Sequence, residues 1–320
     1  MVTASTSTSP GTNIPLLSKN IVQQRVDEAR ALANLEQSVD DVNAQYIASC
    51  QTRGQSIAYR RLICMPLTPQ FDPPMGIFSH GHIQTGDKMS LPKCFLEAIT
   101  LNKAEVPWLF EVRRIDGVTG PRVEPSRSGV ADAEEDDETT TTSKKRKKKA
   151  SQTEWKPTDW GAAPPADETL EAVVGSCLDF RAPPNYIFLP WWMMRALGLK
   201  PRDVVDVRQI TTVAPGGMVK FRPLTDQTLK DIANPQAVFE TELRHYSSLT
   251  AGSTIAFDYN KKRYWFEVAE CRSSVRGEKR PMIKCQDCDV ATDYLPARDK
   301  VNARKKKLMK QQQDDDDDDE

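Results

Sequence analysis

Two cysteines near the carboxyl end have the spacing of a metal-binding motif. Cys285 and Cys288 are separated by two residues, and thiolates at this spacing can ligate Zn²⁺. A structural zinc site uses four ligands, whereas Cys271 is the one further cysteine close by in the sequence. We therefore predict that no metal binds here, with zinc binding as the alternative interpretation.

The histidines supply neither an obvious metal site nor a catalytic base. His80 and His82 could chelate a metal, but they lie in a Gly- and Pro-rich stretch without a third ligand nearby. We interpret both as loop residues. His245, the remaining histidine, falls inside a predicted helix, so a Ser/His/Asp or Cys/His relay has few bases to draw on.

Other catalytic signatures are missing from the sequence. It contains no Walker-type phosphate loop, no dinucleotide-binding fingerprint and no Asp-Thr/Ser-Gly pair of an aspartic protease. We therefore predict no enzymatic activity, no catalytic residues and no cofactor. An aspartic-protease-like activity is kept as a third alternative, because some β-barrels of the kind predicted below are enzymes.

An unbroken basic run is the best candidate for a short linear motif. It consists of Lys144, Lys145, Arg146, Lys147, Lys148 and Lys149. The run could be a nuclear import signal, or a nucleic-acid contact whose affinity falls steeply with salt. It could also be a solvated stretch, partly neutralised by the acidic residues at 132–138. Since no aromatic residues interleave the bases, we rank import above nucleic-acid binding.

The composition favours an intracellular protein. The 320 residues carry a net charge of only −1, and the seven cysteines are scattered and odd in number, which suits a reducing compartment. The sequence begins without a secretory leader, and no apolar run is long enough to span a membrane. We expect a soluble protein of the cytoplasm and nucleus, without membrane insertion.

Three segments have the composition of disordered chain. Residues 1–17 are rich in Ser, Thr and Pro, a charged insertion occupies 118–167, and a charged tail occupies 300–320. Between the first two, residues 18–57 form a predicted helical extension. There Leu32, Leu35, Val39, Val42 and Tyr46 recur at spacings of three and four, which is one face of a helix. We expect this face to dock on the same chain, with a short coiled coil as the alternative.

An internal repeat positions the remaining elements. KMSLPKCFLEAI at 88–99 and YIFLPWWMMRAL at 186–197 each read as a strand, a Leu-Pro junction and a short helix, and a matching strand follows each of them. Proline restricts its predecessor to extended geometry and fits the first position of a helix. Two such units are too small to bury their apolar faces alone. We therefore predict that they close into one pseudo-twofold β-barrel over 58–215.

The repeat also assigns the aromatic residues of the second junction. Met193 and Leu197 match apolar positions of the first copy, and Trp192 matches a cysteine, so all three are predicted to be buried. Trp191 matches Lys93, so it is expected to point outward. It either lies on a neighbouring loop or is a partner-contact residue.

A smaller α/β unit is predicted for 216–299. It has two helices, at 226–232 and 234–247, a hairpin of strands at 253–259 and 264–271, and a further strand at 281–285. The predicted fold class is mainly β with α+β: a β-barrel followed by a small α/β roll, together with the helical extension and the disordered segments.

Several stretches resemble the ubiquitin fusion degradation protein 1 family. The similarity rests on FLPWWMMRALGL at 188–199, on the block at 220–268, on CDVATDY at 288–294 and, more weakly, on GDKMSLP at 86–92 and PWLFEV at 107–112. The resemblance implies a double-psi β-barrel followed by an α/β roll. Two features depart from the family: the insertion at 118–167, and the absence after Asp299 of its short ATPase-binding and partner-binding motifs.

The resemblance also implies a function. Family members bind polyubiquitin without cutting it, pair with a zinc-finger-bearing partner, and recruit substrates to valosin-containing protein, a hexameric AAA+ unfoldase. The leading hypothesis is therefore an adaptor in proteasomal or ER-associated degradation, with no ubiquitin-contacting residue assigned. The alternative is a nucleic-acid-associated β-barrel that uses the basic insertion.

Overall fold

The computed structural model describes residues 19–54, 58–68, 83–121, 169–304 and 311. The basic run at 144–149, the two histidines at 80 and 82, and most of the predicted disordered segments lie outside these residues. Among the described helices, none combines the length and apolar character needed to cross a membrane.

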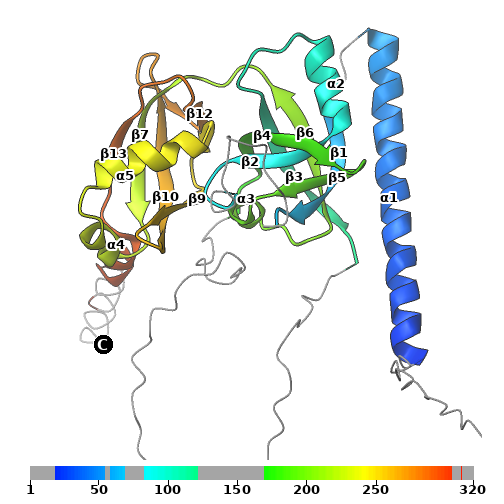
Figure 1. Cartoon of the computed structure of the whole chain (residues 1–320), viewed down its shortest axis with the longest axis horizontal. Helices are drawn as coiled ribbons and strands as arrows, with labels where there is room; N and C mark the ends of the chain where they lie inside the picture. Colours follow the sequence, from blue (N-terminus) through cyan, green and yellow to red (C-terminus); the bar gives the residue numbers. More distant parts are fainter. Residues whose placement is uncertain (1–18, 55–57, 69–82, 122–168, 305–310, 312–320) are drawn as a thin grey trace, which may run out of the picture.

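A long helix stands beside the rest of the molecule. Helix α1 spans Lys19–Arg53, and Figure 1 shows its amino-terminal turns running past the barrel. Val39 is its main anchor, 1% exposed and packed with Ile63 and Val204 of the barrel. The face predicted from the apolar spacing thus docks on the same chain. Three apolar residues of the first turns are exposed: Ile21, Val22 and Val26.

Six strands form a closed barrel, in the order β1-β5-β2-β4-β3-β6. Their bounds, with those of two short helices, are β1 Tyr59–Pro66, β2 Lys88–Pro92, α2 Lys93–Leu101, β3 Leu109–Thr119, β4 Ala172–Ala182, β5 Tyr186–Leu189, α3 Trp191–Ala196 and β6 Asp203–Ile210. A closed barrel leaves no open sheet edge, so each half is completed by the other.

The strand pairing has the predicted twofold character. The twofold operation exchanges β1 with β4, β2 with β5 and β3 with β6. It converts the parallel pair β1–β5 into the parallel pair β4–β2. It likewise converts the antiparallel pair β1–β6 into β4–β3, and leaves β2–β5 and β3–β6 unchanged. Leu91 and Leu189, the leucines of the two junctions, are both 0% exposed in one core. The repeat is therefore a structural repeat.

The Leu-Pro junctions act as strand-to-helix switches. Pro92 and Pro190 have extended backbone, with ψ of 154° and 147°, and each caps the helix that follows it. Each proline therefore lies one position before the first helical residue, and not at the first helical position that the sequence predicted. Trp192, Met193 and Leu197 are buried as predicted, and the Trp192 indole donates to Gly86 O at 2.7 Å.

Two sequence predictions need correction at the barrel. Strand β3 continues to Thr119, so the predicted insertion cannot begin at 118. Gly117, whose backbone is left-handed with φ of 82°, lies within the strand and does not end it. Trp191 is half-buried and packs against the main core, so its ring is less exposed than the match to Lys93 suggested.

The second unit is built on a sheet with the path β11-β10-β7-β13, with β9 paired to β10. The bounds are β7 Gly216–Pro223, α4 Asp226–Asp231, α5 Pro235–Glu242, the 3-10 turn η2 Leu243–His245, β8 Ser248–Thr250, β9 Thr254–Tyr259, β10 Lys262–Ser273, β11 Lys279–Arg280, β12 Met282–Lys284 and β13 Ala291–Tyr294. β8 and β12 form a separate pair. With the barrel, this confirms a mainly β, α+β fold.

The second predicted helix is shorter than expected. Regular α-helix ends at Glu242 and tightens into η2, after which Tyr246 is already extended, with ψ of 116°. The tightening places Tyr246 in the core, where its hydroxyl donates to Ala256 O at 3.1 Å. The start of the helix agrees with the prediction, because Asn234 Oδ1 accepts from Ala237 N at 3.2 Å and Pro235 follows it.

Candidate functional site

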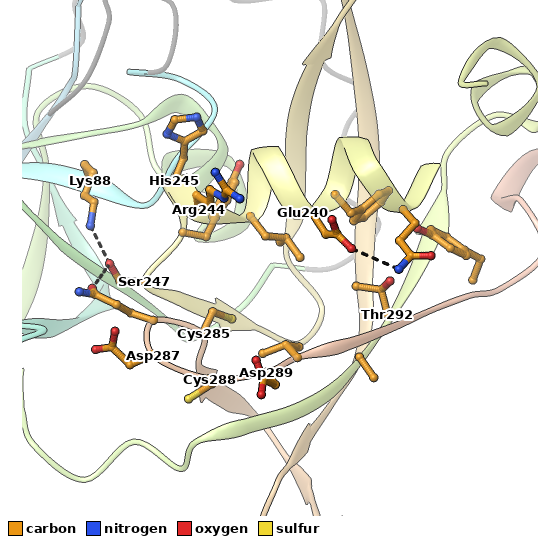
Figure 2. Close-up of a pocket in the computed structure, with 18 residues that line it drawn as sticks. Lys88, Glu240, Arg244, His245, Ser247, Cys285, Asp287, Cys288, Asp289 and Thr292 are labelled. Carbon is orange, nitrogen blue, oxygen red and sulfur yellow. Dashed lines mark hydrogen bonds between the residues drawn. The ribbon is translucent and has the colours of Figure 1, made fainter. Parts of the chain in front are cut away.

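A groove of about 1260 Å³ runs along the second unit (Figure 2). One wall is α5 with η2, and the other is the segment 285–290 together with the start of β13. Lys88 of the barrel closes one end. The groove thus lies where the two units meet, a position that binding sites often occupy.

The helical wall is held in place by its buried face. Phe239 is 1% exposed and stacks among aromatic rings of the sheet, with ring centroids 4.7 Å from Phe221 and 4.5 Å from Phe257. This packing leaves polar side chains at the rim. Glu240 accepts a hydrogen bond from Gln236 Nε2 at 3.2 Å, and both are exposed.

The opposite wall is a turn that carries acidic side chains. Asp287 has left-handed backbone, with φ of 57°, and the segment is tied to the core where Cys285 N donates to Ser247 O at 2.8 Å. Asp287 and Asp289 are exposed. Within the described residues, no ion pair involves either carboxylate. The groove therefore has a negative wall.

Cys285, one of the two cysteines of the groove, has little nucleophilic character. Burial raises the pKa of the Cys285 thiol well above its ordinary value, and the nearby Cys271 and Asp87 act in the same direction. A protonated thiol is a poor nucleophile and a poor metal ligand. Among the described residues, no three His, Cys, Asp or Glu side chains converge as a metal site requires.

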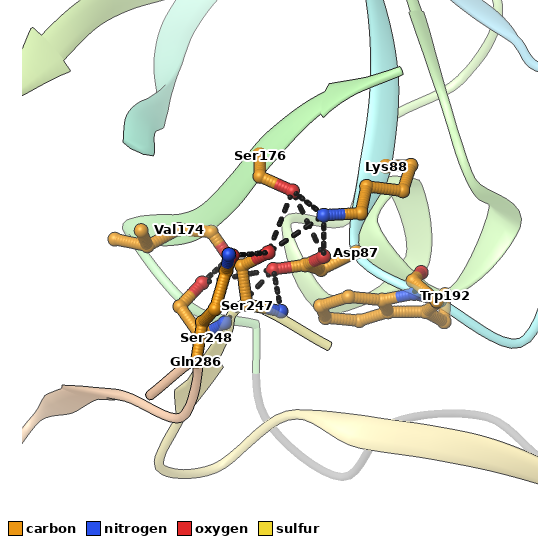
Figure 3. A network of polar contacts seen from close by, with 9 residues as sticks. Asp87, Lys88, Val174, Ser176, Trp192, Ser247, Ser248 and Gln286 are labelled. Carbon is orange, nitrogen blue, oxygen red and sulfur yellow. Dashed lines mark hydrogen bonds and ion pairs between the residues drawn. The ribbon is translucent and has the colours of Figure 1, made fainter. Parts of the chain in front are cut away.

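A buried carboxylate lies behind the end of the groove (Figure 3). Asp87 is 0% exposed, and its Oδ2 accepts from Ser247 N at 2.8 Å and Ser248 N at 2.9 Å. Its Oδ1 accepts from Ser176 Oγ at 3.1 Å. A buried carboxylate is tolerated only when hydrogen-bonded and charge-compensated. Asp87 meets the first condition with donors from both units.

Lys88 supplies the compensating charge. Its Nζ lies 3.7 Å from Asp87 Oδ1 and donates to Ser176 Oγ at 2.5 Å and Ser247 Oγ at 2.6 Å. The amine thus bridges a serine of the barrel and a serine of the roll. The arrangement therefore serves to hold the barrel and the roll together.

The joint extends along strand β8 of the roll. Ser248 Oγ donates to Val174 O at 3.1 Å, and Val174 N donates to Thr250 Oγ1 at 3.1 Å, so β8 is hydrogen-bonded to β4 of the barrel. Because these groups are buried, breaking the joint would leave polar atoms unsatisfied. We therefore expect the groove to keep one shape.

Of the residues that the sequence analysis considered, Cys285, Cys288 and His245 line the groove, but the buried carboxylate behind it was missed. Asp87 and Lys88 fall within a stretch used for the family resemblance, yet nothing in the sequence marked that aspartate as buried. Of the candidates it did name, Trp191 donates its backbone N–H to Gln84 Oε1 at 2.9 Å and is not among the residues that line the groove. Its role as a partner contact stays a prediction.

Comparison with known proteins confirms the family resemblance. Residues 215–297 match the family described as "Ubiquitin fusion degradation protein UFD1, N-terminal subdomain 2". The chain is 35% identical over 126 residues to "Ubiquitin fusion degradation protein 1 homolog" of Dictyostelium discoideum, covering 39% of this chain and 36% of the relative. It is 33% identical over 131 residues to "Ubiquitin fusion degradation protein 1" of Saccharomyces cerevisiae, covering 41% and 35%.

A human relative has a more explicit name. "Ubiquitin recognition factor in ER-associated degradation protein 1" is 33% identical over 117 residues, which cover 37% of this chain and 36% of the relative. The chain thus spans about a third of the length of these curated relatives. Apart from Lys88, all residues that line the groove fall within 215–297.

Proposed function

From its similarity to the ubiquitin fusion degradation protein 1 family, we propose that this chain is an adaptor that binds ubiquitin chains and performs no bond chemistry. It would help to deliver polyubiquitinated proteins to a hexameric AAA+ unfoldase, for proteasomal or ER-associated degradation. The observation that carries the proposal is the match of residues 215–297 to a subdomain of that family, since relatives matched by this chain are named for ubiquitin recognition.

The architecture supports binding over catalysis. In the groove, burial raises the pKa of the Cys285 thiol, and Lys88 is paired with a buried carboxylate. We further propose that the closed six-stranded barrel is a double-psi barrel. The exchange symmetry of its strand pairs and the parallel pairs β1–β5 and β2–β4 support that topology.

The further partners follow from the family alone. A heterodimer partner with zinc fingers and an ATPase of the valosin-containing-protein type are proposed on that ground, although residues 300–320 contain none of the family's short binding motifs. We propose a cytoplasmic and nuclear location, with Lys144–Lys149 as the import signal. Trp191 is proposed as a contact for one of the protein partners.

Capture on immobilised tetraubiquitin tests the main proposal. The full chain and a variant lacking 122–168 should be retained equally, because the proposed surface belongs to the folded units. Monoubiquitin at the same total ubiquitin concentration should retain less protein, since several weak contacts add their effects. No retention of the full chain on tetraubiquitin would refute the adaptor proposal.

The basic run favours nucleic-acid binding as the second candidate. If all six of its bases contact phosphates of duplex DNA, the affinity should fall roughly 10³-fold between 50 and 200 mM salt. The variant lacking 122–168 should then lose nucleic-acid binding and keep ubiquitin binding. Absence of binding to either nucleic acid at 50 mM salt would remove this alternative.

A further inference from the structure

The strand beside the groove lies at the end of its sheet. Along the sheet path β11-β10-β7-β13, β13 pairs in parallel with β7 on one side. On its other side, no strand of the described part of the chain pairs with it. An unpaired edge presents backbone donors and acceptors at regular spacing, and such an edge can accept another chain.

The register identifies which backbone groups face outward. Leu295 N donates to Phe221 O at 2.8 Å, so residue 295 is directed at β7. Backbone groups alternate between the two edges of a strand, and therefore residues 291 and 293 also face β7 while Thr292 and Tyr294 face away. Tyr294 N is used locally, since it donates to Asp293 Oδ1 at 2.8 Å. Thr292 thus offers both its N–H and its C=O at the free edge.

The groove runs along this same edge. Thr292 and Tyr294 line it, and α5 forms the other wall, where Figure 2 shows Glu240 across from Thr292. A groove between an edge strand and a helix fits an extended peptide. Such a peptide bonds its backbone to the strand and places alternate side chains between the two elements.

The charge of the groove indicates which side chains a bound peptide would carry. Asp287 and Asp289 are exposed on one wall, and Glu240 lies at the rim of the other. Of the bases in the lining, Lys88 is engaged by Asp87, and Arg244 lies at the barrel end, as Figure 2 shows. An incoming lysine or arginine would meet the acidic wall, and a glutamate would be repelled.

We propose that this groove binds an extended peptide segment that adds as a strand to β13 and directs a basic side chain at Asp287 and Asp289. The segment belongs to a partner protein. The proposal goes beyond ubiquitin-chain binding and does not depend on it. The backbone edge supplies affinity for any extended chain, and the acidic wall supplies the preference for basic sequences.

Thr292→Pro tests the strand addition. Proline removes the N–H that faces the free edge and leaves the bonds of residues 291, 293 and 295 to β7 in place, a position that edge strands tolerate. The probe is the fluorescein-labelled octapeptide VTKVTKVT, and its affinity for the full chain is measured by anisotropy. We expect binding to weaken about tenfold in Thr292→Pro and to stay unchanged in Thr292→Val, which keeps the backbone donor.

A second experiment changes the peptide and not the protein, so it avoids any effect of a substitution on folding. The same octapeptide, N-methylated at its four central residues, cannot donate to the strand edge from its central part. It should bind the unmodified protein about tenfold more weakly than the parent peptide. Amide hydrogen exchange at Thr292 should also slow when the parent peptide is added, because a strand partner protects that N–H.

Charge substitutions test the basic side chain. Asp287→Asn combined with Asp289→Asn should weaken binding of VTKVTKVT by about fivefold at low salt. The matched control, Glu105→Gln, changes an exposed carboxylate between α2 and β3 and should have no effect. The acidic peptide VTEVTEVT should bind more weakly than VTKVTKVT to the unmodified protein.

Three outcomes would overturn the proposal. The first is equal binding of the parent and N-methylated peptides, which would exclude strand addition. The second is stronger binding of the acidic peptide. The third is concentration-dependent dimerisation that Thr292→Pro abolishes, without any peptide binding, which would assign the edge to a second copy of the chain. Tetraubiquitin capture is a separate measurement, so none of these outcomes would decide the proposal that the chain binds ubiquitin.

Discussion

At the scale of single residues, the roll keeps one carboxyl group in an unfavourable environment. Glu242, the last residue of α5, is 5% exposed. Burial raises its pKa from 4.5 to about 6, and the charge of Asp258 adds to the effect. The hydrogen bond from Asp258 N, at 3.4 Å, and the charge of Arg263 act against it. Folding therefore favours the protonated form of Glu242 relative to the unfolded chain.

This residue predicts a pH dependence of stability. Because the pKa of Glu242 is raised in the folded state, its protonated carboxyl group contributes to the free energy of unfolding. That contribution is fully present below about pH 4.5 and is lost as the pH rises through about 6. Glu242→Gln removes the titrating group. It should raise the free energy of unfolding at pH 7 by up to about 2 kcal/mol relative to the wild type, and have little effect at pH 4. Urea unfolding at several pH values measures this difference.

The control for that prediction is on the same helix. Glu240→Gln changes an exposed carboxylate and should leave the pH profile unchanged. If Glu242→Gln and the wild type differ by the same amount at pH 4 and pH 7, the substituted carboxyl is not the titrating group.

At the scale of elements, one side chain completes the edge of a barrel strand. Asn43 of α1 donates from Nδ2 to Arg61 O and accepts at Oδ1 from Arg61 N, both at 2.8 Å. β5 pairs with β1 only from Ile63 onward, so Arg61 lies before the first paired residue. Asn43 thus takes the place of the missing strand partner, which explains why α1 is held at this point.

Asn43→Ala should loosen the helix from the barrel. It removes two buried hydrogen bonds and leaves the backbone of Arg61 without those partners, so we expect a loss of about 2 kcal/mol in the free energy of unfolding. Amide exchange in α1 should accelerate more than exchange in the barrel. Gln45→Ala, an exposed change in the same turn, is the control. Equal exchange in α1 of the two variants would contradict this role.

At the scale of the whole molecule, the barrel and the roll are joined through a buried charge. Asp87 accepts hydrogen bonds from the backbone of the roll, and Lys88 donates to a serine of each unit. The joint lies directly behind the groove, so it sets how the barrel and α5 are placed. We therefore expect the two units to unfold together in a single transition.

Asp87→Ala should uncouple the two units. It leaves Lys88 without its compensating charge and the hydrogen-bond donors of the roll unpaired. We expect the free energy of unfolding to fall by about 3 to 5 kcal/mol. We expect the single unfolding transition to split, with amides of β8 exchanging before those of the barrel. Asp116→Ala, which removes an exposed ion-pair partner of Arg114, should cost below about 1 kcal/mol. A single transition in Asp87→Ala would contradict the coupling.

The sequence by itself determined the barrel and its two halves. The Leu-Pro junctions restrict the backbone locally, and the apolar residues after them, such as Met193 and Leu197, repeat at one helical face, so both signals can be read within about twelve residues. The docked face of α1 and the cap at Asn234 were predicted for the same reason. The partial burial of Trp191 was not predicted, because it depends on packing against core residues that are distant in the sequence.

Only the tertiary structure decided where the candidate site lies. Asp87 and Ser247 are 160 residues apart, and Asp87 and Ser176 are 89 apart, so no local pattern connects them. The free edge at Thr292 likewise exists because β13 ends a sheet whose order is not the order of the sequence. Burial, charge compensation and an unpaired edge are properties of neighbours in space, and chain folding creates those neighbours.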